Sequence, residues 1–66
     1  MNADRVPIYE KMNLTIKEAA EYSNIGEHKI REMVARLNCP FKLYVGKKVL
    51  IKRLEFEKYI SSQIEI

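Results

Sequence analysis

The stretch that decides the fold is LTIKEAAEYSNIGEHKIREMVARL, residues 14–37. Thr15 is followed three residues later by Glu18. This is the spacing of a capping box, in which the hydroxyl and the carboxylate each accept a backbone amide at the start of a helix. Apolar residues then recur at helical spacing. The pattern predicts a short helix that begins after Thr15 and ends at Tyr22 or Ser23.

A turn and a second helix follow. Gly26 can adopt a positive φ or cap the next helix, and Ile25 is an apolar residue that can pack between two helices. Beyond the turn, apolar residues form one stripe of a helix: Ile30, Met33, Val34 and Leu37. The opposite face and its flanks carry ionisable or small side chains: His28, Lys29, Arg31, Glu32, Ala35 and Arg36. Two short helices joined by a glycine turn, the second with a basic outer face, are typical of a helix-turn-helix.

After Leu37 the period of the pattern changes from helix to strand. The segment Asn38-Cys39-Pro40 ends the helix, because asparagine tolerates the left-handed conformation and proline cannot continue a helix. Two alternating runs then flank Gly46-Lys47-Lys48, which predicts a β-hairpin with a cationic tip. The hairpin residues expected to face the helices are Phe41, Leu43, Val49 and Ile51.

A third helix is predicted from Arg53 onward, with an acidic outer face. Its apolar positions are Leu54, Phe56, Tyr59, Ile60 and Ile64. Residues 1–7 are expected to be a mobile arm, and residues 61–66 are expected to fray. The order helix, helix, hairpin, helix predicts a single α+β domain over residues 1–66, a small winged helix-turn-helix.

Composition limits the class of protein. A hydrophobic share of 47% in 66 residues indicates one globular domain close to the lower size limit for a stable core. No apolar run reaches the length of a membrane span, and the N-terminus lacks the pattern of a signal peptide. The single cysteine, Cys39, cannot form an internal disulfide. We therefore expect a cytoplasmic protein that does not act at a membrane.

The positive charge is concentrated in one segment. Residues 27–53 contain eight lysines and arginines against two glutamates, whereas residues 1–26 and 54–66 each carry a small negative excess. A basic segment in an otherwise near-neutral chain is the electrostatic pattern expected for a polyanionic partner. A merely solvated face is the alternative, and the concentration in one segment favours nucleic acid.

The sequence predicts no catalysis, no metal and no cofactor. His28 and Cys39 stand eleven residues apart with no second pair of metal ligands. Neither has a nucleophile or base arranged with it in sequence, and Cys39 is expected to be a loop or core residue. The four tyrosines lack the arginine and histidine groups that a tyrosine nucleophile needs for DNA strand exchange.

Two stretches give the chain a resemblance to a known family. They are VPIYEKMNLTIKEAAEYSNIGEHKI, residues 6–30, and GKKVLIKRLEFEKYI, residues 46–60. With both in place, the sequence resembles the excisionases, or recombination directionality factors, of conjugative transposons from Gram-positive bacteria. The capped first helix alone is shared with the wider MerR-like DNA-binding superfamily.

The resemblance implies a small accessory protein that binds and bends DNA near the ends of a transposon. Such a protein helps a tyrosine integrase to assemble the excision complex and does no bond chemistry itself. The implied partners are double-stranded DNA at the transposon ends and the integrase of the same element. A chain this small covers a short site, so several copies side by side on the DNA are also expected.

The expected DNA contacts fall into two groups. Candidates for contacts with base edges, where sequence is read, are His28, Lys29, Arg31 and Glu32. Candidates for the DNA backbone and the wing are Arg36, Gly46, Lys47, Lys48 and Lys52. Glu27 and Glu32 can either accept hydrogen bonds from cytosine or repel phosphate. Arg53 can either bind phosphate or cap the last helix.

Two alternatives to an excisionase stay open. A small transcriptional regulator with the same fold would bind upstream of a promoter instead of at the end of an element. A protein-interaction module would use an exposed helix and would keep its function after Lys47→Ala and Lys48→Ala. Such a module should also expose an apolar patch, and the sequence shows none clearly.

Overall fold

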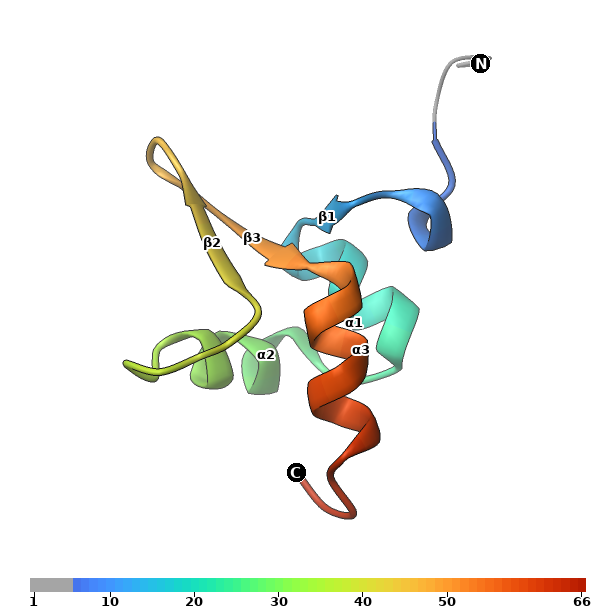
Figure 1. Cartoon of the computed structure of the whole chain (residues 1–66), viewed down its shortest axis with the longest axis vertical. Coiled ribbons are helices and arrows are strands. Elements are labelled where there is room, and N and C mark those ends of the chain that lie inside the picture. Colours follow the sequence, from blue (N-terminus) through green and yellow to red (C-terminus); the bar gives the residue numbers. More distant parts are fainter. Residues whose placement is uncertain (1–5) are drawn as a thin grey trace.

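The structure, a computed structural model, describes residues 6–66. In chain order it contains a short 3-10 helix η1 (Ile8–Glu10), strand β1 (Asn13–Leu14), helices α1 (Ile16–Ser23) and α2 (Glu27–Val34), strands β2 (Lys42–Val45) and β3 (Lys48–Lys52), and helix α3 (Arg53–Ser61). Figure 1 shows the hairpin of β2 and β3 projecting from the body of the molecule. These residues form a small α+β fold of the winged helix-turn-helix type, as the sequence predicted.

The capping signals of the first two helices are confirmed. The Thr15 hydroxyl accepts the Glu18 amide at 3.1 Å, and the Glu18 carboxylate accepts the Thr15 amide at 3.0 Å. Asn24 ends α1 in the left-handed conformation, with a φ of 63°. Gly26 caps α2 with a φ of −62°, so the positive φ of this turn belongs to Asn24 and not to the glycine.

Loss of this capping box should destabilise the domain measurably. We expect Thr15→Ala to lower the free energy of unfolding by about 1 kcal/mol, because the Glu18 amide loses its acceptor. Urea unfolding followed by circular dichroism measures this difference. Thr15→Ser keeps the hydroxyl and should stay close to the wild type, and equal losses in both variants would contradict the capping role.

The three strands form one antiparallel sheet in the order β1-β3-β2. β2 pairs with β3 from Lys42 opposite Ile51 to Val45 opposite Lys48, so the connecting turn is Gly46-Lys47, and Lys48, predicted in the turn, is instead the first residue of β3. Gly46 has a φ of +61°, which the tight turns of two-residue hairpins require and glycine adopts without strain. β1 pairs with the other edge of β3 and thereby fixes the N-terminal segment to the hairpin.

The core lies where the helices meet the base of the hairpin. Its buried side chains come from β1, the three α-helices, β3 and the residue before β2: Leu14, Ala19, Ile30, Met33, Phe41, Ile51 and Phe56. Phe41 and Phe56 pack edge to face, with ring centroids 5.1 Å apart. Tyr59 and Ile60 pack against this core, which confirms the predicted seam of α3. The core therefore fixes α2 relative to the hairpin.

The predicted inner face of the hairpin was wrong at Leu43. Residues directly opposite each other in antiparallel strands share a face, and Ile51, which is buried against the helices, lies opposite Lys42. Leu43 lies opposite Leu50 and therefore on the other face of the sheet. Val49 shares the face of Ile51 but lies outside the core, and Phe41 reaches the core from just before β2.

Three predicted apolar positions of the helices are exposed: Leu37, Ile64 and Leu54, which is 58% exposed in the first turn of α3. α2 ends at Val34, and the Arg36 amide bonds to the Met33 carbonyl, which tightens the chain into a turn. Leu37 is thereby placed in this turn, 95% exposed, and not on the helical stripe. α3 ends at Ser61, whose hydroxyl donates to the Glu57 carbonyl, and the Ser62 hydroxyl donates to the Tyr59 carbonyl. Ile64 is fully exposed beyond this end.

The two ends of the chain are only partly described. The predicted mobile arm, residues 1–7, lies outside the described residues except for residues 6 and 7. Residues 62–66 follow α3 without regular helix or strand. Within residues 6–66, no helix is long and apolar enough to cross a membrane.

Candidate nucleic-acid interface

Helix α2 presents the predicted base-reading side chains to solvent. Burial of Ile30 and Met33 fixes the rotation of the helix and leaves the opposite face free. His28, Arg31 and Glu32 are exposed on that face, and Lys29 is half-buried at its flank. A helix with one face packed on the core and the opposite face exposed has the form that enters the major groove of DNA.

The charges on α2 are paired with one another along the helix. Arg31 lies 3.4 Å from Glu27, and Glu32 lies 3.4 Å from Lys29 and 3.3 Å from His28. Exposed pairs of this kind stabilise a helix by only about 0.3–0.5 kcal/mol and are readily exchanged for another partner. The two glutamates thus offset the charges of Lys29 and Arg31, and α2 itself contributes almost no excess charge.

Most of the unpaired positive charge lies after α2. Seven cations form no ion pair with any residue in 6–66; Lys17 lies in α1, Lys58 lies in α3, and the other five are Arg36, Lys42, Lys47, Lys48 and Lys52. These five come from the turn that follows α2 and from the hairpin. In Figure 1 the hairpin and α2 both lie on the left side of the view, whereas η1 lies on the right. The attraction for a polyanion therefore comes mainly from the turn and the wing.

Two wing residues were missed by the sequence analysis. Lys42 shares the face of Ile51, and its ammonium group donates to the Arg36 carbonyl at 3.2 Å. Tyr44 is on the same face, with its ring centroid 5.4 Å from that ammonium group. A sequence signal could have found them. With a two-residue turn at Gly46-Lys47, strand alternation places Lys42 opposite Ile51, and Tyr44 then shares their face.

The predicted wing residues are not all brought together. Gly46 and Lys47 form the exposed turn of the hairpin. Lys48 and Lys52 are on the face of β3 opposite to Ile51, since alternate residues of a strand point to opposite faces. Lys52 lies at the base of the hairpin, opposite Asn13 of β1, so the structure separates it from the α2 side chains.

The other face of the sheet carries an apolar groove. Met12, Leu43 and Leu54 line it, and its volume is about 480 Å³. Met12 is 81% exposed, so the structure shows an exposed apolar patch that the sequence did not reveal. Its charged lining residues are two glutamates and two cations, Glu10, Glu55, Lys52 and Arg53, so the groove carries no net positive charge to attract phosphate. We therefore place it outside the candidate nucleic-acid interface.

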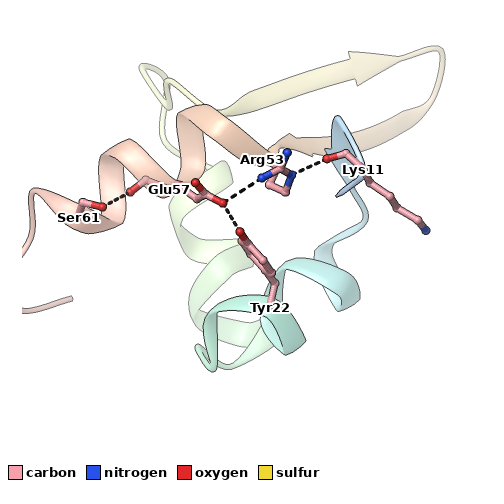
Figure 2. A network of polar contacts seen from close by, with 5 residues as sticks. All are labelled: Lys11, Tyr22, Arg53, Glu57 and Ser61. Atoms are coloured by element: carbon pink, nitrogen blue, oxygen red, sulfur yellow. Dashed lines mark hydrogen bonds and ion pairs between the residues drawn. The ribbon is translucent and has the colours of Figure 1, made fainter. Parts of the chain in front are cut away.

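Arg53 belongs to an internal polar network and not to a phosphate site. Its Nε donates to the Lys11 carbonyl at 2.6 Å, and one terminal nitrogen donates to Glu57 at 3.1 Å. The hydroxyl of Tyr22 also donates to Glu57, as Figure 2 shows. The network ties α1, α3 and the segment before β1 together, and only 18% of the Arg53 side chain is exposed. The network therefore stabilises the packing of α1, the first helix of the helix-turn-helix, against α3.

Two carboxylates in the scaffold have a lowered pKa. The hydrogen bond from the Lys11 ammonium group, followed by that from the Thr15 amide, lowers the pKa of Glu18. The hydrogen bond from Tyr22 and then the bond from Arg53 lower the pKa of Glu57. A lowered pKa in the folded state means that both groups favour folding in their charged form.

This shift predicts a loss of stability in acid. The stabilisation from Glu18 is fully present above its unfolded pKa of about 4.5 and is lost as the pH falls through the lowered folded value. We expect Lys11→Met to raise the pKa of Glu18 in an NMR titration. The stability gap between wild type and Lys11→Met should be larger at neutral pH than at pH 3, about one unit or more below the unfolded pKa. A gap that does not depend on pH would contradict this pairing.

The fold and the exposed α2 define the class of the protein as a winged helix-turn-helix. The family model described as the excisionase from transposon Tn916 matches residues 1–65. The chain is also 38% identical over 63 residues to the excisionase from transposon Tn916 of Streptococcus agalactiae, covering 94% of each chain. The chain belongs to this excisionase family, as the sequence resemblance implied.

Proposed function

We propose that this protein binds and bends DNA at the ends of a conjugative transposon and thereby promotes excision by the tyrosine integrase of the same element. It works in the cytoplasm as an accessory factor and carries out no bond chemistry. The observation that carries the proposal is the combination of an exposed helix-turn-helix with five cations after α2 that lack an ion pair within residues 6–66. Membership of the excisionase family supports it.

The proposed contacts divide into reading and anchoring. His28, Lys29, Arg31 and Glu32 read base edges from α2, where a good bidentate contact discriminates by about 1–3 kcal/mol. Arg36, Gly46, Lys47 and Lys48 approach the backbone from the turn and the wing. The position of Lys52 at the base of the hairpin makes it the weakest of the predicted phosphate contacts.

DNA bending follows from the one-sided placement of charge. Cations held on one side of the duplex neutralise phosphates there, and the projecting hairpin adds contacts along the adjoining groove or backbone. Smooth bending of a short site costs on the order of a few kcal/mol, which the added contacts offset. A domain of 66 residues covers a short site, so specificity comes from several copies or from the integrase alongside.

Excision reconstituted from purified components tests this function. The reaction contains DNA carrying both ends of the element and its integrase, with and without this protein. We expect the protein to raise the yield of excised circle. If the yield is unchanged while the protein binds upstream of a promoter, the result would instead support a transcriptional regulator.

The wing supplies a sharper test of DNA anchoring. We expect Lys47→Ala to weaken binding to specific and scrambled duplexes alike and to lower the slope of log affinity against log salt by about one. Lys58→Ala, which removes an exposed lysine from α3, is the matched control and should leave the slope unchanged. Fluorescence anisotropy over a salt series measures both.

One observation favours a second candidate function. The apolar groove lined by Met12, Leu43 and Leu54 is the kind of surface that protein-interaction modules expose. As a pure interaction module, the protein would keep its activity after Lys47→Ala and Lys48→Ala. Loss of activity in these variants would exclude that reading.

A further inference from the structure

We infer that Arg36 and Lys42 form a preordered binding site for one phosphate of the DNA backbone, with Tyr44 and Tyr59 as positioning residues. This site rests on the proposed DNA binding and adds to it an anchor between the reading helix and the wing. Neither the recognition-helix pattern nor the cationic hairpin tip includes Lys42 or Tyr44.

Both cations are held in place before any ligand arrives. The Lys42 ammonium group donates to the backbone carbonyl of Arg36 at 3.2 Å and lies 5.4 Å from the ring centroid of Tyr44. A terminal nitrogen of Arg36 makes a long hydrogen bond of 3.5 Å to the hydroxyl of Tyr59. Tyr59 is itself packed on the core through Phe41. These contacts restrict two long side chains, so less conformational entropy is lost when they bind an anion.

Arg36 and Lys42 retain unneutralised positive charge and free N–H donors that a ligand can use. Neither cation forms an ion pair with any residue in 6–66. An ammonium group has three N–H donors and a guanidinium group has five, and the contacts of Lys42 and Arg36 within the protein each use one. Two uncompensated cations with spare donors, on residues joined by the bond from Lys42 to the Arg36 carbonyl, match the charge and the acceptors of a phosphate.

The position of the site gives it a specific role. Arg36 lies in the turn directly after α2, and Lys42 is the first residue of β2. A phosphate held by both is therefore fixed relative to the helix and the wing together. Phosphate contacts of this kind set the register of a reading helix on the duplex while carrying no sequence information themselves.

Methylphosphonate substitution tests the site, because it removes the charge of one chosen phosphate. Duplexes from the element's end, each neutral at a different backbone position, are titrated with wild type and with Lys42→Met. We expect one position at which neutralisation weakens wild-type binding about tenfold, the size of a charged hydrogen bond. At that position Lys42→Met should lose almost nothing more, although it binds the unmodified duplex about tenfold more weakly.

The controls separate an anchor from a general charge effect. Lys58→Met, which removes an exposed lysine of α3, should keep the wild-type response at every position. Tyr44→Leu keeps the charge and should weaken binding less than Lys42→Met while leaving the salt slope unchanged. Lys42→Arg should restore most of the affinity and the sensitivity to the same phosphate.

Two results would overturn the site. One is a Lys42→Met variant that loses affinity yet stays sensitive to neutralisation at every position, since Lys42 would then act through the fold. The other is equal binding by wild type and Lys42→Met. Failure of the wild type to bind any unmodified duplex would instead overturn the proposed DNA binding itself, and the site with it.

Discussion

Phe56→Ala should leave the domain largely unfolded at room temperature. Phe56 is 1% exposed and packs edge to face on Phe41 with ring centroids 5.1 Å apart. Truncating a buried phenylalanine costs about 3–5 kcal/mol, and a core in a domain of this size rarely supplies more than about that amount. The loss of the α-helical circular dichroism signal without denaturant is the measurement.

Two further variants show that this loss belongs to the buried ring. Leu54→Ala removes an apolar side chain from the same helix that is 58% exposed, and it should change the free energy of unfolding by less than about 0.5 kcal/mol. Phe56→Leu keeps most of the volume and should fall between wild type and Phe56→Ala. A folded Phe56→Ala variant within about 1 kcal/mol of wild type would contradict this account of the core.

Arg31→Ala should remove most of the preference for the element's end over a scrambled duplex. Arg31 is exposed on α2, and its partner there is Glu27 at 3.4 Å. Because this pair is exposed, breaking it costs little stability, so a change in binding reports on DNA contact. A lost bidentate contact with a base costs about 1–3 kcal/mol of discrimination, or about 5- to 150-fold.

The comparison of affinity losses on the two duplexes distinguishes a base contact from a phosphate contact. Binding to the scrambled duplex should fall only slightly in Arg31→Ala, in contrast to the uniform loss expected for Lys47→Ala. Lys17→Ala, which removes an exposed lysine from α1, is the matched control and should preserve the preference. Equal weakening on both duplexes would show that Arg31 holds phosphate and does not read bases.

The local signals in the sequence predicted most of the fold. The capping box at Thr15, the N-cap at Gly26 and the hairpin turn at Gly46 each depend on residues close together in the chain. Their geometry follows from backbone chemistry alone. The order of helices and hairpin was therefore correct before any tertiary contact was known.

The errors arise where tertiary packing decides. The apolar stripe of α2 was extended to Leu37 because periodicity does not show where the chain turns away from the core. The strand alternation was counted from Phe41, which lies before β2, so Leu43 was placed on the wrong face. Strand register, and not composition, determines which hairpin side chains share a face with the helices.

The candidate site was also only partly predictable. The exposed face of α2 follows from its apolar stripe, but the partners of Arg53 lie in distant segments, at Lys11 and Glu57. The contact between Lys42 and Arg36 needs the hairpin to fold back beside the end of α2. The sequence therefore identified the exposed helix and the cationic hairpin tip, and missed the contact between Lys42 and Arg36.

The most direct test of DNA recognition is fluorescence anisotropy with two labelled duplexes, one from the element's end and one scrambled, over a salt series. We expect tighter binding to the end duplex and a steep loss of affinity with salt on both. Absence of binding to either duplex at low salt would contradict the account, and would mean that the basic segment after α2 is a solvated surface.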